Sequence, residues 1–215
     1  MKAKKLITIL ILGAIIFPGC FLKSVHPLVQ PDDAILMDGL EGRWESDDQR
    51  WTFLHDPSNF PELMETEAFV LEDDETFMDG QQVYMILFEN LQDVSADTTI
   101  LLGMVSKWSD NYFLDLSVMF RSLRNAGAEE SFIDGHFQPV HSISKIKIEE
   151  GKLAIEFFED AWIKGLIDNN RVRIKHEKVD GDVLVTASTS ELQKFVAKYG
   201  DDDDAFDDPV KLARK

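Results

Sequence analysis

The sequence predicts a mainly β protein: a single antiparallel β-barrel or β-sandwich of about ten short strands, with a short helix and a C-terminal amphipathic helix. Three observations support this fold class. Short apolar or alternating segments recur along the chain, and Gly, Asn and Asp residues that favour turns separate them. Only two segments space their apolar residues as a helix does. Hydrophobic residues make up 44% of the 215 residues, which is enough for one packed core.

The first residues predict a leader for export. Three lysines precede an apolar run, Leu6–Phe17, and Pro18 and Gly19 follow it. A membrane-spanning helix needs about 20 apolar residues, so this run is too short to remain in a bilayer. Basic residues, a short apolar run and a small residue before a cleavage point are typical of a secretory signal peptide, which here covers residues 1–19.

Cys20 is the only cysteine of the chain and directly follows this leader. A single cysteine cannot form a disulfide within the chain, so its position needs another explanation. The run that ends in Gly19-Cys20 resembles the lipobox of bacterial lipoproteins, although Phe17 and Pro18 differ from the usual residues. The resemblance implies that Cys20 is acylated and held in the lipid bilayer by three chains. With Phe21 next, it implies the periplasm-facing side of the outer membrane of the cell envelope.

The rest of the chain divides into three parts. Residues 20–33 contain prolines and no periodicity, which predicts a lipidated N-terminus and an extended tether of about 40 Å at most. Residues 34–200 hold the predicted β-rich domain. Residues 201–215 begin with six aspartates in eight positions and predict an acidic C-terminal tail. An EF-hand calcium loop is excluded, because its glycine and glutamate positions hold Phe206 and Leu212.

The first half of the domain contains six predicted strands. An acidic turn joins the first two into a hairpin. Two of the others, Gln82–Phe88 and Thr99–Val105, are apolar at both odd and even positions; this favours strands covered on both faces, with a helix as the alternative. In the sixth, alternation places Asp115 and Ser117 on the solvent face. The predicted strands are Arg43–Ser46, Arg50–His55, Ala68–Leu71, Gln82–Phe88, Thr99–Val105 and Tyr112–Phe120.

The second half combines alternating strands with two helices. Asp180-Gly181 is a strong turn signal between the last two predicted strands. Apolar pairs at helical spacing predict a helix over Asp160–Asp168. A second helix, Ser188–Tyr199, begins with the capping box of Ser188 and Glu191 and carries one apolar stripe. The predicted strands are Lys145–Glu149, Leu153–Phe157, Val172–Glu177 and Val183–Thr186.

The charge of the chain excludes one class of partner. Its formal net charge is −18, and removal of residues 1–19 takes away three further lysines. So acidic a protein repels nucleic acid, and it repels anionic lipid head groups as well. The sequence therefore predicts no nucleic-acid partner, and it predicts that the acyl chains rather than a basic patch make the membrane contact.

Two tryptophans are the candidate ligand-binding residues. Gly42-Arg43-Trp44 opens the first predicted strand, and Trp51 lies in the next. A Gly-x-Trp at this place resembles the signature of lipocalins, which implies a small barrel that carries an apolar ligand near Trp44 and Trp51. The alternative is that both rings fill the barrel core, since large aromatic side chains dominate core packing.

No catalytic residue, metal ligand or cofactor is predicted. His136 and His141 lie close in sequence to Asp134, but the chain has no His-Glu-x-x-His spacing. It also has no Gly-x-Ser-x-Gly elbow around a nucleophilic serine. An enzyme is left open only if folding assembles a site that the linear order does not show, with a cleft around these three side chains as one example.

Five further sets of residues form a recognisable pattern: Ser24–Leu28 shortly after Cys20, Gly39–Trp44 with Trp51–Phe53, Phe113–Leu116, Pro139–His141, and Leu184–Thr189 with Glu191–Gln193. Together they resemble a group of uncharacterised bacterial lipoproteins, and that resemblance assigns no reaction, ligand or catalytic residue. The sequence thus predicts a membrane-anchored lipoprotein of unknown biochemical role that binds a protein partner in the cell envelope. A lipocalin-like carrier of a small apolar ligand and an envelope enzyme are the alternatives.

Overall fold

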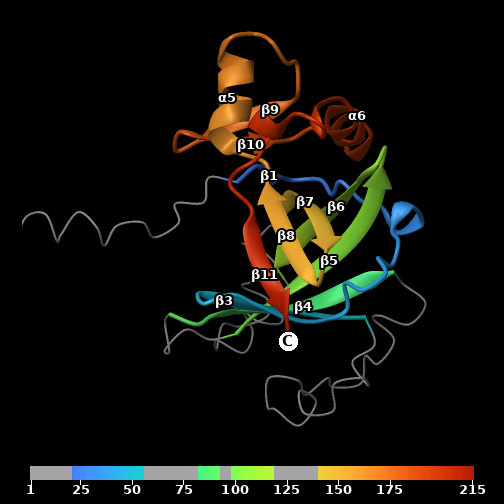
Figure 1. The fold of residues 1–215 in the computed structure, drawn as a ribbon. Helices are drawn as coiled ribbons and strands as arrows, with labels where there is room; N and C mark the ends of the chain where they lie inside the picture. Colours follow the sequence, from blue (N-terminus) through green and yellow to red (C-terminus); the bar gives the residue numbers. More distant parts are fainter. Residues whose placement is uncertain (1–20, 56–81, 93–97, 119–139) are drawn as a thin grey trace, which may run out of the picture.

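The computed structural model describes residues 21–55, 82–92, 98–118 and 140–215. These residues contain eleven strands, two α-helices and two short 3-10 helices (Figure 1). In chain order they are β1 (Lys23–Ser24), η1 (Pro31–Asp33), β2 (Gly42–Glu45), β3 (Gln49–Leu54), β4 (Val83–Asn90), β5 (Thr99–Trp108), β6 (Asn111–Val118), β7 (His141–Glu149), β8 (Lys152–Phe157), α5 (Asp160–Asp168), β9 (His176–Val179), β10 (Asp182–Val185), α6 (Thr189–Tyr199), η4 (Asp203–Ala205) and β11 (Val210–Arg214).

Eight strands close into an antiparallel barrel, so the predicted mainly β fold is confirmed and the barrel is the form it takes. The order around the barrel is β2, β3, β4, β5, β6, β7, β8 and β11. The last strand closes the ring, because β11 pairs with β2 and places Arg214 opposite Trp44. Closure leaves no free edge among these eight strands.

Inward-facing side chains form a buried cluster inside the barrel and pack closely against one another. Gly103 of β5 shows how tightly: a Cβ there would lie 2.5 Å from Cδ1 of Ile86 and 3.1 Å from Cδ1 of Leu114. Those two side chains therefore occupy the space that a larger residue at this position would need. The buried cluster of the barrel consists of Leu40, Trp44, Trp51, Phe53, Tyr84, Ile86, Val105, Leu114, Leu116, Ile146, Leu153, Ile155 and Leu212.

A second layer caps one end of the barrel. β7 extends beyond the end of β8, and β1 pairs with His141 and Ser142 in that extension. β10 adds to β1 in parallel, and β9 adds to β10. Figure 1 shows α5, β9, β10 and α6 together at this end, opposite the C-terminus. We call this layer the cap; its core includes Leu22, Leu28, Phe113, Ile143, Phe158, Ile163, Val183, Leu192 and Phe195.

Both predicted helices are present. α5 covers Asp160–Asp168, as its apolar spacing predicts. α6 begins after Ser188 with the predicted capping box: Ser188 N–H donates to Glu191 at 3.0 Å, and the Ser188 side chain accepts in return from the backbone of Glu191. Leu192, Phe195 and Val196 form the buried stripe of α6. This stripe seats the helix on the cap core.

The prediction of a free tether over residues 20–33 is wrong for the residues that the structure describes. The chain is packed from Phe21 onward: Phe21 bridges to Glu159, and Leu22, Leu28 and Val29 are fully buried. Prolines and missing periodicity are typical of a tether, but they equally suit an irregular segment that docks on a sheet.

The prediction of an acidic tail over residues 201–215 is also wrong for its last part. Val210–Arg214 forms β11, which pairs with β8 and β2. Leu212 points into the barrel and is 1% exposed. A five-residue strand with one fully buried side chain shows almost no alternation of apolar and polar residues in the sequence. Pairing with β8 and β2 is therefore what determines that this segment is a strand.

The remaining predicted strands agree with the structure except at one place. Arg171–Lys175 precedes β9 without joining the sheet. Ile174 is buried in the cap core, so the alternation there reflects packing rather than a ladder of hydrogen bonds. The predicted strand Ala68–Leu71 lies outside the described residues.

Asp160, the first residue of α5, is a buried acid beside the N-terminal segment. It is 6% exposed, and its Oδ1 has no hydrogen-bond partner among the described residues. Burial raises the pKa of its carboxyl, and the neighbouring Asp182 adds to this, while the N–H of Val183 and the ammonium of Lys23 act in the opposite direction. Ionised Asp160 is therefore less favourable in the folded protein than in the unfolded chain.

We expect Asp160→Asn to change how stability depends on pH. Because the folded pKa is raised, the folded protein binds this proton more tightly, and the associated stability is lost as pH rises through the folded pKa. The free energy of unfolding of the wild type should thus fall relative to that of Asp160→Asn as pH rises above about 3.9, the ordinary pKa of an aspartate. Urea unfolding at a series of pH values measures the free energy of unfolding of both proteins. Asp180→Asn, a change at an exposed turn, is the control. If the free energies of wild type and Asp160→Asn depended on pH in the same way, the prediction would be contradicted.

Candidate functional site

Trp44 and Trp51 are cross-strand neighbours inside the barrel. They lie opposite each other in the ladder of β2 and β3. Trp44 is fully buried and donates from Nε1 to the carbonyl of Leu40 at 2.8 Å; Trp51 is 5% exposed and donates to Gln49 Oε1 at 2.8 Å. The sequence thus singled out two residues that the fold brings together. Both indole N–H groups already have protein partners.

Other aromatic side chains surround this pair. The ring of Trp51 lies 5.1 Å from that of Phe88 in an edge arrangement, and Arg214 stacks over Trp44 at 5.2 Å. Further along, the phenol of Tyr84 accepts from Met37 N–H at 2.9 Å, and burial raises the pKa of Tyr84. The segment before β2 is thereby tied to the barrel. The result is an aromatic core whose polar atoms are satisfied within the protein.

A buried carboxylate joins the barrel to the N-terminal segment. The Asp115 side chain is fully buried, and its Oδ2 accepts from Leu28 N–H at 2.6 Å and Val29 N–H at 3.1 Å. Its Oδ1 lies 2.7 Å from Nδ1 of His141. We call these four residues the Asp115 clasp. It orients the imidazole of His141 and fixes residues 28–29 against β6 and β7.

Sequence reasoning placed Asp115 on the solvent face, and that prediction is wrong. The outer face of β6 is covered by the N-terminal segment and by α6, where Phe113 lies against Gly200. Asp115 interrupts an otherwise apolar run, and that interruption is the one sequence signal of a buried polar contact. The other proposed partners of His141, namely Asp134 and His136, lie outside the described residues, and so does the lipid-attachment candidate Cys20.

The other described histidines are dispersed. His55 and His176 each contact a backbone carbonyl through Nδ1, that of Val83 at 3.2 Å and that of Ile174 at 2.8 Å. His26 is exposed. Over the described ranges, no cluster of three or more His, Cys, Asp and Glu side chains is placed to hold a metal ion.

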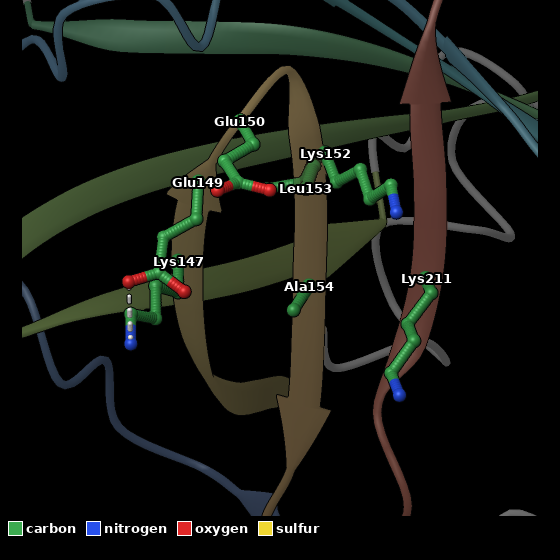
Figure 2. A pocket seen from close by; sticks show the side chains of 7 residues that line it. All are labelled: Lys147, Glu149, Glu150, Lys152, Leu153, Ala154 and Lys211. Atoms are coloured by element: carbon green, nitrogen blue, oxygen red, sulfur yellow. Dashed lines mark ion pairs between the residues drawn. The ribbon is translucent and has the colours of Figure 1, made fainter.

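A depression of about 520 Å³ lies on the outer wall of the barrel, over β7, β8 and β11 (Figure 2). Lys147, Ala154 and Lys211 stand side by side across these strands, so the small alanine leaves a hollow between two lysines. Lys147 pairs with Glu149 at 2.8 Å, which raises the pKa of Lys147. The lining is charged and solvated, which suits a surface contact more than an enclosed ligand.

The comparisons with known proteins bring no assignment to these sites. No protein-family model, curated protein or solved structure matches this chain. Within the described residues, none of the helices has the length and apolar character needed to cross a bilayer.

We expect Asp115→Ala to destabilise the protein by about 3 kcal/mol or more. The change leaves two buried N–H groups and an imidazole without their acceptor, and each loss of a charged hydrogen bond costs about 1.5–3 kcal/mol. Urea unfolding gives the free energy, and amide hydrogen exchange should accelerate first at Leu28 and Val29. Asp110→Ala, an exposed aspartate in the β5–β6 turn, is the control; equal stability of the two variants would contradict the clasp.

Proposed function

We propose that this chain is a membrane-anchored lipoprotein of the bacterial cell envelope, attached to the bilayer through acylated Cys20, and that its barrel binds a protein partner. The proposal rests on the position in the sequence at which the folded domain begins. Phe21 bridges to Glu159, and Leu22 N–H donates to the carbonyl of Phe158 at 3.0 Å. The residue next to the candidate anchor is therefore already part of the domain.

This arrangement suits attachment at Cys20. One residue spans about 3.5 Å at most, so an acyl anchor there would hold the barrel beside the head groups rather than tens of ångströms away. The Asp115 clasp and the buried Leu22 brace the same segment against the cap. Because these contacts fix the N-terminal segment to the cap, a domain attached at Cys20 would keep one defined face toward the membrane.

Two features support a protein partner. Side chains pack closely around Gly103 inside the barrel, and we therefore place the proposed contact on the outer surface. Two exposed valines, Val118 at 43% and Val140 at 38%, are the chain neighbours of the paired residues Ser117 and His141 at one barrel rim. Neighbouring apolar side chains of this kind suit a contact with another protein surface.

Mass spectrometry of membrane fractions tests the anchor. We expect a mature chain that begins at Cys20 and carries the mass of a diacylglyceryl group and an amide-linked acyl chain. Cys20→Ala should lose that mass completely, because the thioether needs the sulfur, whereas His26→Ala, an exposed change in the same segment, should keep it. A mature chain that begins elsewhere, or an unmodified thiol on Cys20, would contradict the proposal.

A lipocalin-like carrier is the second candidate, favoured by the closed barrel of eight strands with Trp44 and Trp51 side by side inside it. Barrels of this size either fill with side chains or hold one small ligand. For the leading proposal we expect a fatty acid to cause no saturable quenching of tryptophan fluorescence. A carrier would instead show saturable quenching that Trp44→Phe and Trp51→Phe reduce and that the cap variant Trp162→Phe leaves intact.

A further inference from the structure

A basic groove runs across the cap, between residues 171–174 and α6. Its volume is about 270 Å³. Four of its side chains are cationic and one, Glu191, is acidic; the rest are apolar or aromatic. We call it the cap groove, and its lining consists of Arg171, Val172, Arg173, Ile174, Glu191, Lys194, Phe195, Lys198 and Tyr199.

The single acid of the cap groove leaves the cations largely uncompensated. The Glu191 carboxylate accepts from Ser188 N–H at 3.0 Å and from its hydroxyl at 2.8 Å, and these bonds lower the pKa of Glu191. Arg171, Arg173 and Lys194 form no ion pair with any residue that the structure describes. Exposed cations that are not held in ion pairs are available to an anionic ligand.

This local charge opposes the charge of the whole protein. Residues 161–200 hold seven basic and five acidic residues, whereas the whole chain holds 22 basic residues and 40 acidic ones. Four aspartates, Asp201–Asp204, follow α6 directly, but they are not part of the lining of the cap groove, which combines positive charge with apolar side chains.

Aromatic side chains lie at the edge of the groove. Trp162 of α5 packs edge-on against Tyr199 at 5.3 Å and against Phe195 at 6.2 Å. Trp162 and Tyr199 are partly exposed, and Lys198 lies over the Tyr199 ring at 4.5 Å. Tryptophan and tyrosine beside lysine and arginine are typical of surfaces that sit at the boundary between lipid and water.

The cap groove and the start of the fold share one end of the barrel (Figure 1). Phe21 bridges to Glu159, the residue before α5. Phe158, next to that bridge, lies 5.7 Å from Phe195, whose other side lines the groove. A chain attached at Cys20 would thus bring this end, rather than the end with the C-terminus, toward the bilayer.

We propose that the cap groove binds the phosphate-bearing head groups of anionic phospholipids, so that the cap rests on the membrane surface. The inference rests on the proposed function for the position of the bilayer. It replaces the sequence-based expectation that an acidic protein keeps its whole surface away from such head groups. Arg171, Arg173, Lys194 and Lys198 supply the charge, and Trp162 and Tyr199 reach the interface.

The test uses the mature chain, residues 20–215, with Cys20→Ser so that no acyl group contributes. Co-sedimentation at low ionic strength compares vesicles of phosphatidylcholine alone with vesicles that also contain phosphatidylglycerol. We expect binding to the anionic vesicles only, with a decline as salt is raised, because exposed charges are screened beyond about 10 Å at 0.1 M salt. The tryptophan emission should shift to shorter wavelength on binding, and Trp162→Phe should remove most of that shift.

Two matched triple variants locate the contact. Arg171→Gln, Arg173→Gln and Lys194→Gln together remove three charges from the cap groove; each charge contributes about fivefold to partitioning, so affinity should fall about 100-fold. Lys147→Gln, Lys152→Gln and Lys211→Gln remove the same charge from the depression of Figure 2 and should leave binding nearly unchanged. All six side chains are exposed, and circular dichroism confirms that each variant is folded.

Two outcomes would overturn the inference: no binding to anionic vesicles, or equal loss of binding in both triple variants. If equilibrium dialysis showed that the groove binds inorganic phosphate while anionic vesicles do not bind, the groove would take free phosphate rather than a membrane. Since this assay needs no acyl group, its failure leaves the anchor at Cys20 standing, and the mass of the mature protein reports on that anchor separately.

Discussion

The clasp of Asp115 is the contact on which the arrangement of the cap depends. A carboxylate without partners is costly to bury, and Asp115 is buried because two backbone N–H groups and an imidazole surround it. Those N–H groups belong to residues 28–29, which are thereby fixed to the outside of β6. Once that segment is in place, β1 can fill the edge that β8 leaves open along β7, and β10 and β9 follow.

The two ends of the chain have different structural roles. The N-terminal segment completes the cap, and the C-terminal strand β11 closes the barrel at β2. As a consequence the two ends of the barrel differ. One end carries the helices, the aromatic contacts of Phe195 and the cap groove, and the other end carries the C-terminus (Figure 1). The proposed attachment at Cys20 would give that difference a direction relative to a membrane.

Local patterns in the sequence were sufficient wherever a segment interacts mainly with itself or repeats over several residues. The capping box and stripe of α6, the spacing of α5 and the hairpin of β2 and β3 are all properties of contiguous residues. The pairing of Trp44 with Trp51 follows from the same hairpin register. Segments that depend on distant neighbours were missed, since neither the docked residues 21–29 nor β11 repeats a pattern of its own.

By itself, the sequence determined that the protein is mainly β, where its helices begin, and that its overall charge is strongly negative, because these depend on composition and on short-range spacing. Only the tertiary structure decided that Asp115 is buried, that the last residues close the barrel, and that Arg171 and Arg173 meet Lys194 and Lys198 in one groove. Those outcomes join residues tens of positions apart, and the distance between such residues is set by the fold as a whole.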